Sequence, residues 1–429
     1  MTGERAGEEQ SKRDHPTGSI ARKAVTMIFN PSSFVKQHSQ ETVLTPPSSP
    51  PDDSAFGPLS VRRIEAARER HGTTVDRYLA YLQAGDPLMD ALVEYHAARS
   101  PERDYLELCQ AIDRGIESIE DPPPPLTRLF EELDHVPFWV DWDRLRIASR
   151  KIIRNGLLTS LSFATYALPH IYLATANKPL GITRHLFDEA AQRYARTSRF
   201  VTDVFMPDGL MRHADGFRLV VLVRHAHARM RRGLLASGVW DPEHYETPIN
   251  QAHVAVSAVF FSLFVVHGLQ RLGVRFSAQE MESVILTWRY VSFILGVDPE
   301  LIGTSEQDAE RLVAISRSLE LDADDLSRRL LRSTIESGPR FLGIEQRRMA
   351  KPMIHFTWQL VRRMLGDTLA DALDVPRQTL PYRLAVRGLP AVVTCLDRAP
   401  WLFPRAVRNF VGVEFWLMRG DYDEFIKPD

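Results

Sequence analysis

Hydrophobic residues recur with helical spacing over most of the chain, from about residue 126 to residue 378. No run of alternating apolar and polar residues in this region is long enough to require a sheet. The pattern therefore predicts an all-α domain of eight or more helices. Prolines and glycines predict where these helices break, at Pro169, Lys178–Pro179, Pro207–Gly209, Pro248, Gly273, Pro299 and Gly303.

The segments on either side of this region have other patterns. Residues 1–57 are polar and charged and end in a proline- and serine-rich linker, which predicts a disordered segment. Residues 58–125 predict an N-terminal helical extension of mixed charge. Residues 379–429 are aromatic and interrupted by proline, and we expect this tail to pack back onto the core formed by residues 126–378.

Residues 192–235 predict two amphipathic helices joined by a Pro-Asp-Gly turn. Counting 100° per residue on the second helix, His227 falls within an apolar stripe formed by Val220, Val223, Met230 and Leu234. His225 falls on the opposite face among arginines, where we expect solvent. Arg224 and Arg231 flank the stripe, so their guanidinium groups could reach an anion at its edge.

The first helix of this pair carries polar side chains on its apolar face. Ala190, Arg193, Thr197, Phe200 and Val204 share one face by their spacing. A buried arginine needs an anionic partner, either a carboxylate or a negatively polarised ligand. An imidazole facing a guanidinium and a hydroxyl could enclose a flat cofactor such as haem. The alternatives are that His227 is an ordinary core residue, or that His225 is the ligand on a differently rotated helix.

The charge and cysteine content indicate which binding partners and which cellular compartment to expect. The chain of 429 residues has 53 basic and 55 acidic side chains and a net charge of −2, which gives no electrostatic reason to expect nucleic acid. Cys109 and Cys395 match no metal or redox spacing, which suits a reducing compartment. The first residues lack the apolar core of a secretion signal, so we expect a cytoplasmic location.

Two uncharged runs are long enough to be considered for membrane insertion, residues 156–176 and 252–269. They contain His170, His253 and His267, and buried core helices are the favoured interpretation, so membrane association is not favoured. His253 and His267 are 14 residues apart and should share a helix face. A metal pair there is conceivable, but no Glu-x-x-His motif accompanies it.

The two central helices carry a family resemblance. Residues 193–205, with Arg193, Arg196 and Thr197, resemble the distal helix of the latex clearing protein family and of related haem-b oxygenase-like proteins. Residues 223–232 resemble the proximal helix of that family. Further segments resemble the family in the same order, namely residues 136–142, 247–253, 272–282, 287–302 and 362–376. Altogether the resemblance covers roughly residues 126–378.

The resemblance implies a globin-like α-helical core, with additional flanking helices, that holds one b-type haem. His227 is then the axial ligand of the iron, and Arg193 and Thr197 contact bound dioxygen. Arg224 and Arg231 are the candidates for binding the haem propionates. Rubber-degrading members of this family cleave a carbon–carbon double bond of polyisoprene to carbonyl ends.

The chain departs from the family pattern at two places. Arg196 stands where some rubber oxygenases have a lysine that caps the iron, and a guanidinium has no lone pair to donate. We therefore expect a distal site that is open or water-bound. The family's catalytic carboxylate has no counterpart, because residues 168–184 contain no Asp or Glu, and His170 or Asn177 is the candidate to occupy that area. The sequence thus supports haem binding more strongly than alkene cleavage.

The combined prediction is a haem-dependent oxygenase that activates dioxygen to oxidise a small, apolar, lipid- or isoprenoid-like substrate. The alternative is a non-catalytic haem- or lipid-binding or sensor protein of the same fold.

Overall fold

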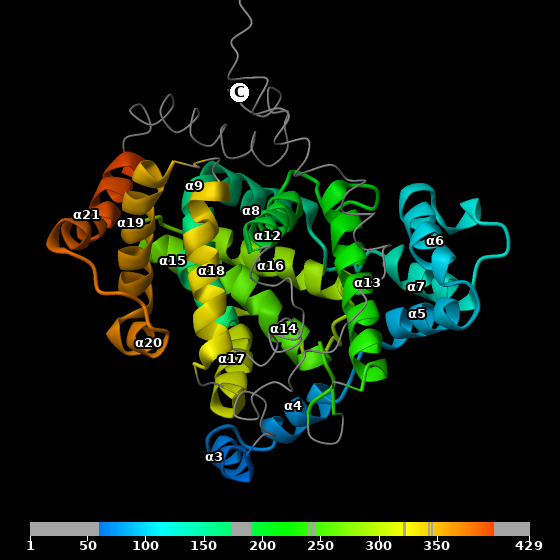
Figure 1. The fold of residues 1–429 in the computed structure, drawn as a ribbon. Helices are drawn as coiled ribbons and strands as arrows, with labels where there is room; N and C mark the ends of the chain where they lie inside the picture. The colour runs from blue at the N-terminus through cyan, green and yellow to red at the C-terminus, as the bar shows by residue number, and fades with distance from the viewer. Residues whose placement is uncertain are drawn as a thin grey trace, which may run out of the picture.

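The computed structural model describes residues 60–173, 190–238, 240–241, 245–320, 323–341, 344 and 346–398. Regular structure in these residues is helical throughout, without a strand, so the predicted all-α class is confirmed. The globin-like arrangement remains a prediction. The predicted disorder of residues 1–57 lies outside the described residues. Figure 1 shows the helices gathered around a central group formed by α14, α15 and α16.

The first helices form the N-terminal part of the chain: α3 (Val61–His71), α4 (Thr74–Leu82), α5 (Pro87–Arg99), α6 (Pro101–Arg114), the short 3₁₀ turn η1 (Ile116–Ser118) and α7 (Pro124–Leu133). The central helices are α8 (Trp142–Arg154), α9 (Gly156–Ser162), η2 (Phe163–Ala167), α10 (Leu168–Ile171), α12 (Ala190–Val204), α13 (Asp215–Ala236), α14 (Gln251–Val259), η4 (Phe260–Phe264), α15 (Val265–Arg271) and α16 (Ala278–Ile294). The last helices are α17 (Glu306–Glu320), α18 (Asp325–Phe341), α19 (Arg347–Leu365), α20 (Asp367–Ala372) and α21 (Leu380–Arg398).

The helix from α14 through η4 to α15 passes through the middle of the molecule. Within the described residues, Gln251–Arg271 is the one stretch whose length and mean hydropathy of 1.9 would allow it to cross a membrane. However, 78% of its apolar window is buried inside the protein. This burial matches the core helix that the sequence predicts here, and on its own the stretch is weak evidence for a membrane span.

The prediction that a helix breaks at Pro169 is wrong. Helices α9, η2 and α10 continue without interruption from Gly156 to Ile171. The segment η2 is π-helical, and the N–H of Leu168 donates to the carbonyl of Phe163, five residues earlier. Proline cannot make the α-helical hydrogen bond to residue i−4. The widened turn directly before Pro169 accounts for how the helix accommodates this residue.

The other predicted breaks that fall on described residues lie between helices. Pro207–Gly209 separates α12 from α13, and Gly273 separates α15 from α16. Pro248 precedes α14, while Pro299 and Gly303 precede α17. Lys178–Pro179 lies outside the described residues.

The N-terminal helices pack directly on the central ones. Figure 1 shows α5 beside α13, and α7 packs on α5. The N–H groups of Thr247 and Gln251 donate to the carbonyls of Leu82 and Ala84, which joins the end of α4 to the start of α14. At the other end of the chain, α21 lies against α19, and the hydroxyl of Thr394 donates to the carbonyl of Gly273 at 3.2 Å.

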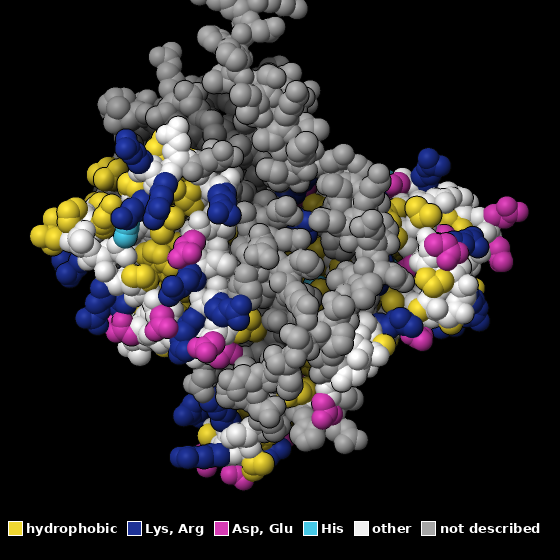
Figure 2. Space-filling view, viewed as in Figure 1, with side chains coloured by type: hydrophobic (Ala, Val, Ile, Leu, Met, Phe, Trp, Pro, Cys, Tyr) yellow, Lys and Arg dark blue, Asp and Glu magenta, His cyan; other side chains and the backbone are white. Residues whose placement is uncertain are grey.

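Figure 2 shows basic and acidic side chains interspersed on the visible face of the molecule. Charges of both signs occur over α3 and over the α5–α6 region, so neither sign dominates the described part of this face.

Candidate functional site

His227 lies on α13 between two arginines that bind α5. Arg224 donates to both carboxylate oxygens of Asp86, at 2.6 and 2.9 Å. One turn after His227, Arg231 donates to Asp90 at 3.1 Å. Because the three side chains are three and four residues apart, they project from one face of α13. Two ion pairs thus fix this helix, and with it the imidazole, against the start of α5.

The His227 side chain has the properties of a potential ligand. It is half-buried, and within the described residues neither ring nitrogen has a hydrogen-bond partner. Burial lowers its pKa to about 4, and the nearby Arg231 acts in the same direction. The ring is therefore neutral at pH 7 and keeps a lone pair on one nitrogen. It borders a small cavity of about 10 Å³ that is also lined by Asn250, Val254 and Leu295.

The proposal that Arg224 and Arg231 bind propionates receives no support from these contacts. Arg224 is only 2% exposed and also contacts Glu132 at 3.0 Å and the carbonyl of Ile294. Burial opposes its charge, but the hydrogen bonds to Asp86 and Glu132 outweigh this effect and raise its pKa. Arg231 also donates to the carbonyl of Ile249 at 2.9 Å. The helical spacing correctly predicted that both arginines lie beside His227. It could not show that the anions next to them are carboxylates of α5.

Two glycines allow the backbone to approach these arginines. A Cβ at Gly296, which has φ +72°, would lie 2.3 Å from the Arg224 guanidinium. A Cβ at Gly85 would lie 2.8 Å from Nε of Arg231. Gln251 joins the two segments, because its amide nitrogen donates to the carbonyls of Gly85 and Gly296 at 3.0 and 2.8 Å. The environment of His227 is therefore closely packed and fully hydrogen-bonded on the α5 side.

His225 does not lie on a solvated face as the sequence predicts. It is 3% exposed, and its Nε2 lies 2.9 Å from Oδ2 of Asp104 on α6. The helical wheel separated the two histidines correctly, but it could not show that α6 covers the cationic face of α13. His225 is thus paired with a buried carboxylate, and His227 stays the candidate ligand on this helix.

The residues proposed to face the cofactor from the other side lie on α12, which packs against α13. Thr197 and Arg196 are both half-buried. Arg193 lies in the first turn of α12, and its side chain is outside the described part of the structure. Val204 is buried and Phe200 is half-buried against Phe261 and Trp288. The pairing of Arg193 and Thr197 with His227 therefore stays a prediction.

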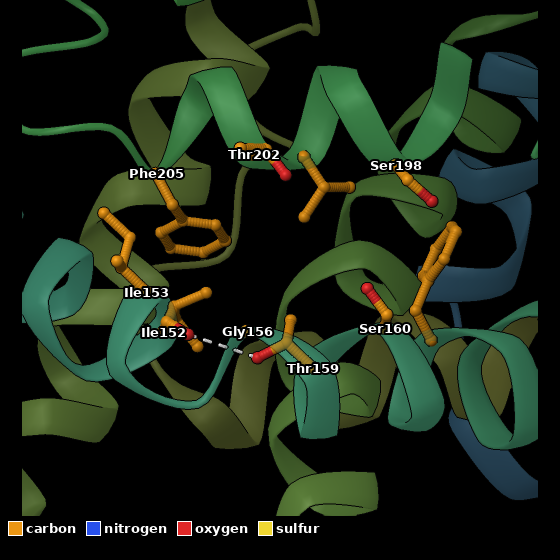
Figure 3. Close-up of a pocket in the computed structure, with 10 residues that line it drawn as sticks. Ile152, Ile153, Gly156, Thr159, Ser160, Ser198, Thr202 and Phe205 are labelled. Carbon is orange, nitrogen blue, oxygen red and sulfur yellow. Dashed lines mark hydrogen bonds between the residues drawn. The ribbon is translucent and has the colours of Figure 1, made fainter. Parts of the chain in front are cut away.

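A small apolar cavity of about 30 Å³ lies along the neighbouring face of α12. Figure 3 shows Ser198, Thr202 and Phe205 on α12 facing Ile152 of α8 and Thr159 of α9. The Thr159 hydroxyl donates to the carbonyl of Ile152 at 3.3 Å, whereas the buried hydroxyl of Ser198 has no hydrogen-bond partner within the described residues. A space of this size accommodates about one water molecule and no larger ligand.

His170 and Asn177 are the two candidates for the area where the family has its catalytic carboxylate, and the structure describes His170. Its Nδ1 lies 2.7 Å from the carbonyl of Tyr166, and its ring packs against Tyr166 and Phe264. Burial lowers its pKa to about 4, and Arg317 and Arg271 add to the effect. The ring is therefore neutral at pH 7, with Nδ1 as the donor to that carbonyl. Asn177 lies outside the described residues.

The two histidines of the central helix have separate surroundings. His253 is buried with Nδ1 3.1 Å from the amide of Asn250, whereas His267 contacts Glu306 on α17 at 3.2 Å. The π-helical segment η4 lies between them. Such a segment changes the helical phase, so a spacing of 14 residues does not place both rings on one face.

The fold and the position of His227 define an all-α protein with a neutral, accessible imidazole at the junction of α5, α13 and α14. A model of the catalytic domain of the family described as ER-bound oxygenase mpaB/B′/rubber oxygenase matches residues 139–394. This span is more than half of the chain, so the protein belongs to this oxygenase family and is an oxygenase. The family resemblance of α12 and α13 is thereby confirmed.

Two individual relatives agree with this assignment. The chain is 24% identical to a rubber oxygenase of Streptomyces sp. (strain K30) over 380 residues, covering 79% of this chain and 84% of that protein. It resembles the solved structure of latex clearing protein LCP in the closed state with a TM-score of 0.60 and 19% identity. The structural match covers 77% of this chain and 90% of the other, and it supports the likeness in fold.

Proposed function

We propose that this protein is a haem-b-dependent oxygenase and that His227 would hold the haem iron. The observation that carries the proposal is the neutral imidazole of His227, which has no hydrogen-bond partner among the described residues and retains accessible surface. A neutral imidazole nitrogen is the donor that haem iron takes from histidine. Bound haem b would supply the binding and activation of dioxygen, which side chains alone do not provide.

The residues around His227 would hold its ring in place. The ion pairs of Arg224 with Asp86 and of Arg231 with Asp90 fix α13 on both sides of the ring. The positive charge of Arg231 also disfavours protonation of the imidazole, which keeps the ligand nitrogen free. This arrangement differs from the carboxylate partner of many metal-binding histidines, because here the carboxylates bind the flanking arginines.

Residues of α12 are proposed to face the reacting oxygen. Arg193 would stabilise negative charge that develops there, and Thr197 would donate a hydrogen bond. Arg196 would contribute a fixed positive charge but no ligand atom, since a guanidinium has no free lone pair. The placement of all three on a helix that packs on α13 supports this assignment.

The proposed substrate is an apolar isoprenoid or lipid with a carbon–carbon double bond. The rubber oxygenase relative and the family description support a substrate of this kind. Cleavage of one double bond by one dioxygen molecule gives two carbonyl groups, so both oxygen atoms and all electrons are accounted for without a reductant.

Oxygen consumption with a short isoprenoid such as squalene tests this reaction. We expect one dioxygen consumed for each pair of carbonyl ends formed. The Arg193→Ala variant should retain haem and lose activity about 100-fold or more, as expected for removal of a charge-stabilising donor. Arg232→Ala, which removes an exposed arginine from α13, is the matched control and should keep full activity. A haem-loaded protein without substrate-dependent oxygen uptake would instead indicate a non-catalytic haem-binding protein.

A further inference from the structure

A third and larger cavity lies along α16, apart from the His227 site. It has a volume of about 570 Å³ and runs between α16, the start of α17 and Arg144 of α8. Its α16 wall is formed by residues at helical spacing, including Met281, Ile285 and Arg289. None of its lining residues is shared with the small cavity beside His227. The volume lies in the range of small-molecule binding sites.

The lining of this groove combines an apolar strip along α16 with charged side chains, of which Arg289 lies nearest the end of the helix. Phe276, Met281, Ile285 and Leu286 provide the apolar surface. Arg289 lies at the far end of the same helix face, three turns from Ala278. A groove with this distribution suits an elongated molecule that has an apolar chain and a polar head.

The charges at the groove determine which polar head it would accept. Glu282 is bound by Arg144 at 2.8 Å, and Glu306 by His267 at 3.2 Å. Both carboxylates therefore have cationic or hydrogen-bonding partners. Arg289 has no carboxylate or hydrogen-bond partner within the described residues, and its guanidinium carbon lies 4.0 Å above the ring of Trp139. Arg289 is therefore the lining cation without an anionic partner among the described residues.

The surroundings of Arg289 favour an anion as its partner. The side chain is half-buried, and this burial lowers the pKa of the guanidinium. A partly desolvated cation gains from an anionic partner that restores the lost solvation. The guanidinium also lies over the ring of Trp139, a contact that favours the cation without using its N–H groups as donors to oxygen.

We propose that this groove binds an apolar chain that ends in a carboxylate, such as a fatty acid or an isoprenoid acid. The carboxylate accepts paired hydrogen bonds from Arg289, and the chain lies along Leu286, Ile285 and Met281 toward Phe276. A carboxylate matches the paired donors of one guanidinium in shape and charge. The site is separate from His227 and does not depend on the proposed oxygenase reaction.

Calorimetric titration of the full-length protein with dodecanoate and with farnesoic acid, each below its micellar concentration, tests the proposal. At least one acid should bind with a stoichiometry of one, and the comparison shows whether a straight or a branched chain is preferred. Dodecanol, which has the same chain without the charge, should bind at least about ten-fold more weakly, as expected for the loss of charged hydrogen bonds.

Four variants locate the binding. Arg289→Gln should weaken dodecanoate binding about ten-fold or more, while Arg275→Gln, an exposed arginine outside the groove, should leave it unchanged. Met281→Trp should block the chain even where the head site is intact. His227→Ala should not affect binding. Absence of binding by both acids, equal binding of dodecanol, an unchanged affinity in Arg289→Gln, or loss of binding in His227→Ala would each overturn the proposal.

Discussion

At the scale of single residues, Arg224 shows what periodicity can and cannot establish. Its position beside the apolar stripe was predictable from a spacing of three residues from His227. Its partner was not, because Asp86 is 138 residues away in sequence and only the packing of α5 on α13 brings them together. Likewise, His225 could not be assigned to a buried pair before the position of α6 was known.

Replacement of Asp86 tests whether the Arg224 pair stabilises the fold. Asp86→Asn keeps the helix cap and the size of the side chain but leaves Arg224 with the partly exposed Glu132 as its remaining anion. We expect a loss of about 3 kcal/mol in the free energy of unfolding, measured by urea titration. Asp76→Asn, which breaks the exposed pair with Arg68, should cost at most about 1 kcal/mol. Equal effects would show that burial of the Arg224 pair has no energetic consequence.

The buried histidines predict an acid-sensitive stability. The pKa of His170 is about 4 in the folded protein, against an ordinary value of about 6.5. Between these values the unfolded chain binds the proton and the folded protein does not, so stability falls as the pH is lowered through this window. The lowered pKa of His170 contributes about 2–3 kcal/mol to the free energy of unfolding at pH 7, relative to pH 4, and this contribution is lost progressively as the pH falls.

Urea unfolding at pH 7, 6 and 5 measures this effect. His170→Phe should make the stability less dependent on pH over this range, while His213→Phe, at an exposed site, should leave the dependence unchanged. An identical pH dependence in His170→Phe and in the unaltered protein would show that His170 titrates normally.

At the scale of helices, the hydrophobic period predicted the number and class of elements better than their continuity. Gly273 follows the end of α15 with φ +101°, and the N–H groups of Gly273 and Val274 donate back to the carbonyls of Gln270 and Leu269, which closes the helix. Pro207–Gly209 lies in the turn that follows α12. Pro169 does not end a helix, because the π-helical segment η2 changes the hydrogen-bond pattern just before it. A second π-helical segment, η4, changes the phase between His253 and His267. Such segments leave no simple signal in a single sequence.

The end of α16 provides a test of close packing around Arg224. Gly296 has φ +72°, and a Cβ there would also collide with the Arg224 guanidinium. Gly238 has φ +68° with open space around it, so it serves as the control for a positive φ without a collision. We expect Gly238→Ala to cost about 1 kcal/mol and Gly296→Ala at least about 2 kcal/mol in the free energy of unfolding. Equal costs would mean that Arg224 moves away without loss.

At the scale of the whole molecule, the region that the family model matches is bound to helices that precede it in the chain. The family model begins at residue 139, whereas Asp86 and Asp90 lie in the predicted extension of residues 58–125. Both carboxylates bind the arginines that flank His227. A contact between segments so far apart in the chain has no local signature in composition or periodicity, which is why the sequence suggested a ligand for these arginines instead.

The central claim, that His227 holds a b-type haem, is tested most directly by the pyridine haemochrome of the purified protein. We predict a spectrum of haem b at one equivalent per chain. His227→Ala should reduce this below about one tenth while the far-ultraviolet circular dichroism remains helical, and His213→Ala should retain full haem content. Full haem content in a folded His227→Ala protein, or a colourless unaltered protein after expression with added haem precursor, would contradict the assignment.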